Sequence, residues 1–290
     1  MTQIAAPSAS RAKSAAPPSS FVALMYHNIA PDGVRRERYS DLSAAVTSYF
    51  INRAAFAVQL DEIAALGSHC MTLESLRGFY ASPAKTDSPL PAVLLTFDDG
   101  WADVFTEAAD LLRERRMQAV VFVTTGFLTR KHCISRSGLA RVDQQLFRIG
   151  SHAVSHRMLC LMEEKQIREE LTESKKILED ATGREVDCIS IPNGAVDARV
   201  RRIAQETGYR FVFDSEVRLN RTGSSPLEIG RVSIKDYTSI DTFRQYIRGQ
   251  FSRERIRRAV LQAPKRLLGL RRYDRLRRRL LGESGGGEVA

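Results

Sequence analysis

The sequence is poor in the features that mark disulfide-rich or membrane-spanning proteins. Its 290 residues include only four cysteines and no C-x-x-C pair, which excludes a disulfide framework and a cysteine-rich zinc knot. We therefore expect buried free thiols in a reducing compartment. No run approaches the roughly 18 consecutive apolar residues that a bilayer-spanning helix needs. Hydrophobic residues at 43% and charged residues at 27% are ordinary for a globular domain, so collagen-like and wholly disordered chains are also excluded.

Acidic residues are scarce in one part of the chain only. Over the whole sequence, Lys and Arg exceed Asp and Glu by 10. Residues 248–282 hold 13 basic and two acidic residues, whereas residues 1–247 hold 31 basic and 30 acidic ones. The excess charge therefore belongs to a C-terminal tail. No zinc, RNP-type or Gly-rich recognition motif accompanies it, so we expect no nucleic-acid partner.

The two ends of the chain differ from its body in composition. Residues 264–281 place leucines and a tyrosine at spacings of three and four, with arginines on the opposite face. This pattern predicts a basic amphipathic helix, which either lies on an anionic membrane surface or packs on the domain with its basic face in solvent. Residues 1–20 lack the apolar core of a secretory signal and are expected to form a disordered leader. The predicted location is the cytoplasm, with the inner face of the membrane as the site of peripheral binding.

Apolar runs and amphipathic stretches alternate through residues 21–247, which we expect to form the main folded domain, with 248–290 as a tail. Runs typical of buried parallel strands lie at 21–26, 92–97, 119–124, 146–150, 188–191, 209–213 and 229–234. Stretches with helical spacing lie at 54–66, 103–116, 163–182 and 198–207, three of them followed by a glycine. The alternation predicts an α/β fold with a parallel sheet.

Polar residues gather just after three of the predicted strands, where parallel α/β folds place their chemistry. They are Asp98 and Asp99, then His152 and His156, then Asn193. Two imidazoles and one carboxylate can hold a divalent metal ion and leave a position open for water. The histidines are four residues apart, so one helix-like turn would point both rings the same way. Taken singly, such an Asp is more often a helix cap, and an H-x-x-x-H pair more often two unrelated surface histidines.

The combination of these motifs is more specific than its parts. T-F-D-D-G at 96–100, S-H-A-V-S-H at 151–156 and a strand followed by P-N-G at 192–194 resemble the polysaccharide deacetylase family. These are the NodB-like, family-4 carbohydrate esterases, and the resemblance extends over about residues 21–234. It implies a distorted (β/α)7-type barrel, here with a basic helical C-terminal tail. It also implies a metal-dependent hydrolase that removes N- or O-acetyl groups from sugars.

The resemblance assigns a role to each of these polar residues. Asp98 would be the catalytic base, while Asp99, His152 and His156 would bind the metal ion. The backbone N–H of Asn193 would contribute to an oxyanion hole. The expected ion is Zn²⁺, with Co²⁺ or Ni²⁺ as alternatives.

The sequence departs from the family pattern in two places. Many members have arginine where Ser190 stands; Arg231, on a later predicted strand, is a candidate to orient the base in its place, and a purely structural salt bridge is its plainer role. No histidine follows His156, although the family acid is usually a histidine of a late motif. L-M-Y-H-N-I at 24–29 resembles the L-x-Y-H-x-I motif of a branch that deacetylates biofilm poly-N-acetylglucosamine. His27 is therefore the candidate general acid, with a buried structural histidine as the alternative.

The predicted function follows from this resemblance. We expect a hydrolase that removes N-acetyl groups from amino sugars of a polysaccharide, such as an exopolysaccharide, or of a lipid-linked glycan at the cytoplasmic face. One alternative is an inactive carbohydrate-binding or membrane-associated scaffold of the same fold. Another is an esterase that removes O-acetyl groups from sugars. The retained Asp98, Asp99 and histidine pair weigh against the scaffold.

Overall fold

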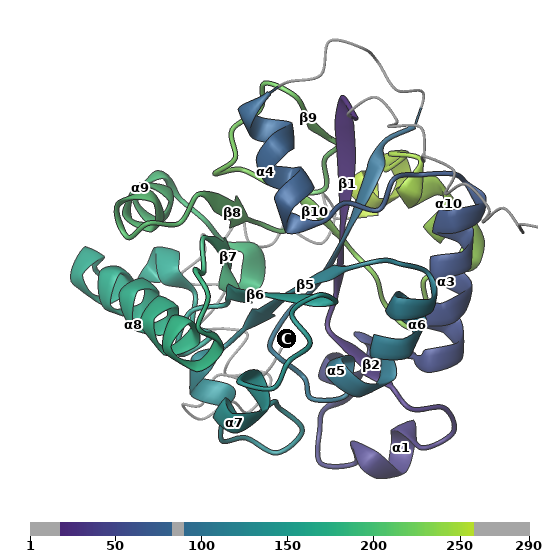
Figure 1. The fold of residues 1–290 in the computed structure, drawn as a ribbon, viewed down its shortest axis with the longest axis horizontal. Helices are drawn as coiled ribbons and strands as arrows, with labels where there is room; N and C mark the ends of the chain where they lie inside the picture. Colours follow the sequence, from purple (N-terminus) through teal and green to yellow (C-terminus); the bar gives the residue numbers. More distant parts are fainter. Residues whose placement is uncertain (1–17, 83–89, 258–290) are drawn as a thin grey trace, which may run out of the picture.

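A strongly curved, mainly parallel sheet forms the centre of the computed structural model, which describes residues 18–82 and 90–257 (Figure 1). The neighbouring strands, in spatial order, are β10 (Arg231–Ser233), β1 (Ser20–Tyr26), β4 (Ala92–Phe97), β5 (Ala119–Val123), β6 (Phe147–Ser151), β7 (Cys188–Ser190) and β8 (Phe211–Phe213). The short strand β9 (Asn220–Arg221) pairs antiparallel with the start of β1. This order confirms the predicted α/β class.

The two ends of the sheet approach each other through the segment before β10. Phe213 of β8 forms a parallel bridge with Ile229, and β10 begins two residues later and pairs with β1. The Asp214 N–H also donates to the Ile229 carbonyl at 2.9 Å. The sheet is therefore curled into a distorted, barrel-like form, as predicted.

The strands are continuous apolar runs because both faces of the sheet are covered. β1 and β4 are buried along their whole length and pair in register from Phe21–Ala92 to Tyr26–Phe97. Alternate residues of β1 join two different apolar clusters, so each face of the strand has its own core. Helix α4 (Leu73–Ala81) packs on one of these clusters through Leu76 and Phe79.

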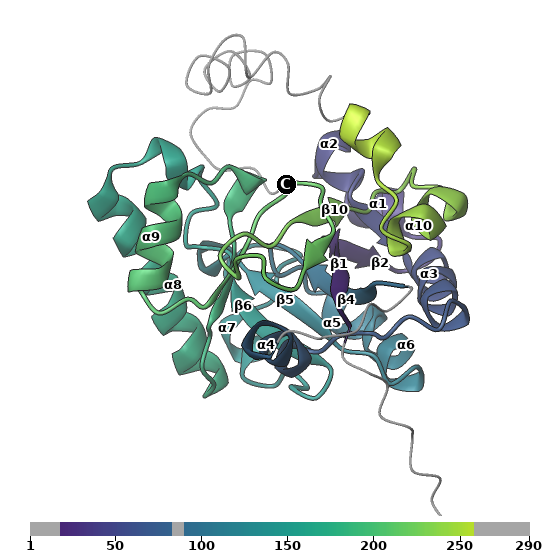
Figure 2. The same ribbon diagram turned by 90° about the horizontal axis from the view of Figure 1, so that it is seen from above.

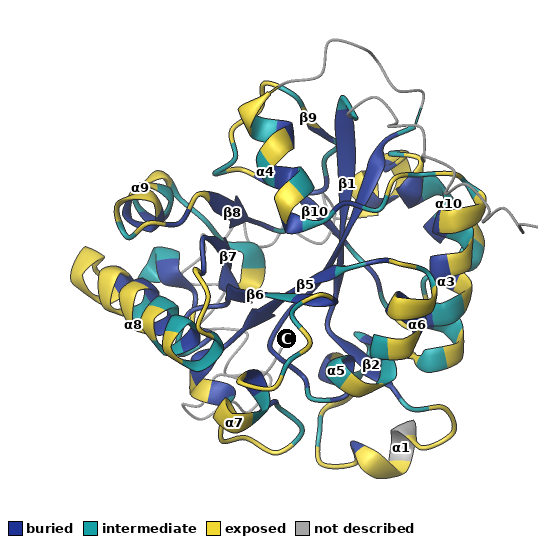
Figure 3. Ribbon diagram, in the orientation of Figure 1, coloured by how far each residue is buried: buried dark blue, intermediate teal, exposed yellow. Residues whose placement is uncertain are grey.

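Longer helices form an outer layer around the sheet (Figures 2 and 3). They are α3 (Arg53–Ala65), α8 (Glu164–Thr182), α9 (Ala198–Glu206) and α10 (Ile240–Ile247). Helix α8 buries the stripe Ile167, Leu171, Ser174 and Leu178 that its spacing predicts, and exposes its opposite face. It ends at Gly183, whose φ of 65° provides the left-handed cap.

Some local features differ from the sequence predictions. The helix predicted at 103–116 is two helices, α5 (Val104–Glu107) and α6 (Ala109–Glu114), separated at Ala108. A small parallel sheet of β2 (Asn28–Ala30) and β3 (Phe50–Asn52) was not predicted, nor were the short helices α1 (Arg35–Arg38), α2 (Ala44–Thr47) and α7 (Arg136–Leu139). The thiols are free as expected, but of the four only Cys188 is fully buried.

Two sequence predictions fall on parts of the chain that the structure does not describe. The leader predicted at 1–20 is described only from residue 18, and the amphipathic helix predicted at 264–281 lies entirely outside the described residues. Within 18–82 and 90–257, no helix combines the length and apolar character needed to cross a bilayer.

Candidate metal and catalytic site

Asp99, His152 and His156 meet at the carboxyl ends of β4 and β6. The Asp99 Oδ1 atom lies 3.6 Å from His152 Nε2 and 3.4 Å from His156 Nε2. One ligand atom from each residue falls within 4.8 Å of the others, and all three side chains are buried. The topology brings them together because β4 and β6 flank β5 and run in the same direction.

The backbone around these residues is in an unusual conformation. Asp99, Ala153 and His156 all have positive φ angles, of 74°, 59° and 59°, a region that costs free energy for residues other than glycine. The helix-like turn predicted for the histidine pair is therefore wrong: the two rings converge from an irregular loop. Such strain at strand ends is typical of functional sites.

The three side chains fit a divalent metal ion. The Asp99 Oδ1 atom is buried and has no hydrogen-bond partner among the described residues, while its Oδ2 atom accepts from Trp101 Nε1 at 3.1 Å. His152 places Nδ1 2.7 Å from the Ser190 carbonyl. That carbonyl requires a proton on Nδ1, so the Nε2 lone pair of the neutral ring faces Asp99.

Burial sets the protonation of these ligands in the absence of an ion. It raises the pKa of Asp99 and lowers the pKa of His152. A cation placed between the three donor atoms would favour the charged carboxylate and the neutral imidazole, which are the forms that ligate metals.

Helix α8 holds the loop that carries the two histidines. Glu170 Oε2 accepts hydrogen bonds from the Val154 and Ser155 N–H groups, both at 2.9 Å. Ser174, the polar member of the buried stripe, lies 2.7 Å from the Ser151 hydroxyl at the end of β6. These contacts tie both ends of the 151–155 segment to a long, regular helix.

Asp98, which precedes Asp99 directly after β4, forms a bidentate ion pair with Arg231. The two guanidinium nitrogens Nη1 and Nη2 lie 2.7 Å from Oδ1 and 2.7 Å from Oδ2, and both side chains are almost fully buried. Ser190 Oγ donates to the same carboxylate at 3.2 Å and accepts from Arg231 at 2.7 Å. Burial alone would raise the pKa of Asp98, but Arg231, with His152 and His27, outweighs it and holds the pKa well below its usual range.

His27 follows β1 and belongs to the same group of charges. Its ring lies 4.4 Å from the ring of Tyr49, and its Nδ1 atom is buried without a hydrogen-bond partner among the described residues. Burial lowers the pKa of His27, whereas the nearby Asp99 and Asp98 carboxylates act to raise it. Burial prevails, so the resting imidazole is neutral.

Asn193 is at the carboxyl end of β7, in a turn that only few residues can form. Its φ of 58° and the 63° of Gly194 are both left-handed, and a Cβ on Gly194 would lie 2.0 Å from Ser215 Oγ. The Asn193 side chain reaches the His156 carbonyl at 3.5 Å. An open hollow of about 470 Å³, lined in part by Gly194, Cys160 and Asp197, lies beside this turn.

Comparisons with known proteins agree with this geometry. Residues 85–212 match the family model for polysaccharide deacetylases. This part of the chain is similar to the polysaccharide deacetylase family. A curated relative is YxkH of Bacillus subtilis (strain 168), whose assignment as a polysaccharide deacetylase is itself provisional. It is 26% identical over 155 residues, which are 53% of this chain and 56% of YxkH, so the match spans only about half of either protein.

Solved deacetylase structures share the fold. The Streptococcus pyogenes deacetylase PplD, determined with acetate, superposes with a TM-score of 0.68 at 19% identity and covers 79% of this chain and 99% of its own. IcaB from Ammonifex degensii superposes with a TM-score of 0.64 at 25% identity, covering 79% of this chain and 96% of its own. The fold predicted for the domain is thereby confirmed.

The candidate site extends beyond the segment that matches the family model. His27 precedes residues 85–212 and Arg231 follows them, yet both lie with Asp98 in one buried group. Sequence reasoning did not identify Trp101, which contacts Asp99, or Glu170, which holds the loop that carries the two histidines. Trp101 could have been noticed as the single tryptophan of the chain, two residues after Asp99; nothing in the sequence distinguishes Glu170 from the other acids of its helix.

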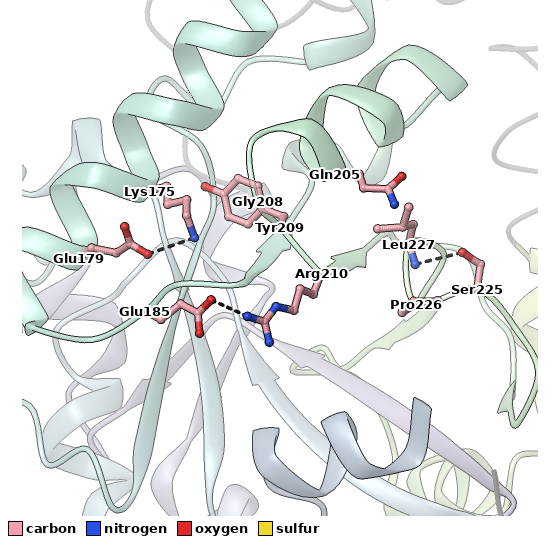
Figure 4. A pocket seen from close by; sticks show the side chains of 10 residues that line it. All are labelled: Lys175, Glu179, Glu185, Gln205, Gly208, Tyr209, Arg210, Ser225, Pro226 and Leu227. Carbon is pink, nitrogen blue, oxygen red and sulfur yellow. Dashed lines mark hydrogen bonds and ion pairs between the residues drawn. The ribbon is translucent and has the colours of Figure 1, made fainter. Parts of the chain in front are cut away.

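A larger hollow lies elsewhere on the protein (Figure 4). Its volume is about 710 Å³, and its lining includes Glu185 and Arg210, which precede β7 and β8 and therefore mark the amino ends of the strands. Its charged side chains pair with one another, Lys175 with Glu179 and Arg210 with Glu185. It is at the opposite end of the sheet from the candidate site.

Proposed function

We propose that this protein removes N-acetyl groups from amino sugars of a polysaccharide or lipid-linked glycan, with a divalent ion, Zn²⁺ by preference, held by Asp99, His152 and His156. The observation that carries the proposal is the Asp98 carboxylate next to this ligand set, paired with a buried arginine. The match of residues 85–212 to the family model for polysaccharide deacetylases supports the same reaction class.

When bound, the ion would polarise the acyl carbonyl and lower the pKa of water. Asp98 is ionised at neutral pH because of Arg231, so it can accept the proton that the attacking water loses. The N–H of Asn193 would donate to the oxyanion that develops on the acyl oxygen. These roles require that the scissile bond of the substrate lie between Asp98, at the carboxyl end of β4, and Asn193, in the turn that follows β7.

His27 is proposed as the general acid for the leaving amine. An amine leaves poorly unless it is protonated, and His27 approaches the same group of charges from β1. Because burial lowers its pKa, its protonated form is a stronger acid than a solvated imidazolium. The L-x-Y-H context of residues 24–27 is the basis for placing the protein near the poly-N-acetylglucosamine deacetylase branch.

The test is to load the purified protein with Zn²⁺ or Co²⁺ and measure amine release from N-acetylglucosamine oligomers. Release with either ion, and none after chelation, is the expected result. Faster cleavage of O-acetylated sugars than of N-acetylated ones would favour the esterase alternative. No turnover with any ion or acyl sugar would favour an inactive carbohydrate-binding scaffold. A cytoplasmic location and binding to the membrane surface through 264–281 rest on the sequence alone.

A further inference from the structure

Two cationic side chains near the candidate site each lie over an aromatic ring, and each of these rings is next to one of the histidines of the site. The Lys235 Nζ atom lies 3.9 Å from the centre of the Tyr49 ring, and that ring lies 4.4 Å from the His27 ring. On the other side, the Arg130 guanidinium lies 3.8 Å from the centre of the Phe127 ring, which lies 5.7 Å from the His156 ring. Both cations come from segments that follow the carboxyl ends of strands, β10 and β5.

Lys235 is held in place by the backbone on either side of it. The Ile234 N–H donates to the Met25 carbonyl, and the Asp236 N–H to the Ser48 carbonyl, both at 2.9 Å. These bonds fix the segment between the end of β1, which leads to His27, and the residue before Tyr49. The side chain is half-buried, and no carboxylate in the described part of the chain pairs with its ammonium group.

A half-buried ammonium group without a carboxylate partner stabilises a nearby anion more than a fully solvated ammonium group does, because less water screens the attraction between the two charges. The contact with Tyr49 satisfies the Lys235 charge only in part, since a cation–π contact leaves the hydrogen-bond donors of the ammonium unused. Tyr237, 61% exposed and 5.8 Å from Lys235, adds an open aromatic face beside it. An aromatic face of this kind can carry the apolar side of a sugar ring.

We propose that the acylated sugar bears an anionic group, a phosphate or a carboxylate, and that Lys235 selects it. This inference rests on the proposed deacetylase function and narrows its substrate class. Lys235 would contact the anion while the acetamido group lies at Asp98 and the metal ligands. Arg130 would add to the positive potential from the opposite side of the site.

The test compares three matched N-acetylglucosamine trimers: a neutral one, one with a 1-phosphate, and one with a lactyl ether carboxylate. The wild-type protein should favour at least one anionic trimer about tenfold in kcat/KM, as expected for a hydrogen bond to a charged group. The preference should weaken in 0.5 M NaCl. Whichever anionic trimer is favoured identifies phosphate or carboxylate as the group selected.

Lys235→Met should remove this preference, so that the ratio of anionic to neutral kcat/KM falls toward one. Lys176→Met, an exposed lysine on the outer face of α8, is the matched control and should keep the wild-type ratio. Equal loss on all three trimers in Lys235→Met, or no anionic preference in the wild type, would overturn the inference.

Calorimetric binding of the same trimers separates this inference from the proposed function. If no trimer is deacetylated but the anionic ones bind more tightly and lose that advantage in Lys235→Met, the anion site stands and the deacetylase function fails. If the trimers are deacetylated without discrimination, the function stands and the anion site fails.

Discussion

Arg231 and Asp98 are 133 residues apart in the chain and form a buried, bidentate ion pair with both N–O distances at 2.7 Å. Each charge offsets part of the cost of burying the other, and Ser190 joins them by hydrogen bonds to both. The pair keeps the Asp98 carboxylate ionised at neutral pH beside the proposed metal-binding residues. The structure also places Arg231 in contact with Asp98, the proposed base. From the sequence, orienting this base was one of two roles suggested for Arg231, the other being a purely structural salt bridge.

Replacement of Arg231 should damage both stability and activity. Arg231→Met leaves the Asp98 carboxylate buried without a counter-ion, and we expect a loss of about 3–5 kcal/mol in the free energy of unfolding. Arg231→Lys keeps the charge but not the bidentate geometry, so it should be more stable than the Met variant and still impaired in kcat. Urea unfolding and amine release measure the two effects. Arg201→Met, a half-buried arginine near Asp214, is the control; equal losses in both variants would contradict the special role of the Asp98 pair.

The contribution of Asp98 to stability should depend on pH in one direction. Its folded-state pKa is held below the 3.8 of the unfolded chain, so its ionisation stabilises the native state fully above that value and progressively less as the pH falls below it. The difference in the free energy of unfolding between the wild type and Asp98→Asn, which we call the stability gap, should therefore become smaller between pH 5 and pH 3. A gap that widens over this range would show that the carboxyl is protonated in the folded protein.

Metal binding should raise thermal stability through three side chains only. An ion that binds the native state and not the unfolded one shifts the melting temperature upward with concentration. When Zn²⁺ is added to protein that has first been treated with a chelator, we expect it to raise the melting temperature of the wild type. It should leave the melting temperatures of Asp99→Ala and His152→Ala unchanged. His132→Ala is the control, since His132 pairs with Asp41 instead. A full Zn²⁺ response in Asp99→Ala would place the ion elsewhere.

Loss of His27 should separate catalysis from metal content. His27→Ala should lower amide hydrolysis by about 10²–10⁴-fold, the range for a general acid, while the bound metal measured by elemental analysis stays at the wild-type level. Cleavage of a chromogenic acetyl ester should suffer less, because a phenolate leaves without prior protonation. Joint loss of metal and activity would make His27 a structural or ligating residue.

The basic segment at 264–281 gives a prediction that is independent of the site. Full-length protein should float with vesicles that contain anionic lipid and not with neutral ones. Changing Arg277, Arg278 and Arg279 to Ala should weaken flotation without changing turnover of a soluble oligomer. Equal flotation of the two proteins on anionic vesicles would exclude these arginines from membrane binding.

Sequence reasoning went furthest where local pattern and topology coincide. The runs that became β1 and β4 and the buried stripe of α8 were predicted nearly to the residue, because each is decided by its own periodicity. The strand-end rule and the family motifs named the polar residues that the structure brings together, and their catalytic and ligating roles stay predictions. The split at Ala108 and the β2–β3 sheet were missed because tertiary packing decides them.

The supporting contacts of the site could not be predicted for a different reason. Glu170 holds the histidine loop from 15 and 16 residues away, and Asp98 depends on a partner beyond the matched family segment. Such contacts leave no periodic pattern in the sequence, because any of several other acidic residues or arginines could have made them. The positive φ at His156 is likewise invisible in the motif, which suggested a helical turn instead.

The position of Arg231 on β10, after Asp98, Asp99, His152 and His156 in the chain, has a consequence for synthesis on the ribosome. Asp99, His152 and His156 are all translated before it, so a nascent chain can bring these three proposed ligands together while Asp98 still lacks its counter-ion. Until residue 231 leaves the exit tunnel, a buried Asp98 carboxylate has no guanidinium to neutralise it. β10, the last strand in the described part of the chain, therefore completes the charge balance of the site as well as the sheet, and chains that stop short of it should be the ones that cellular proteases remove.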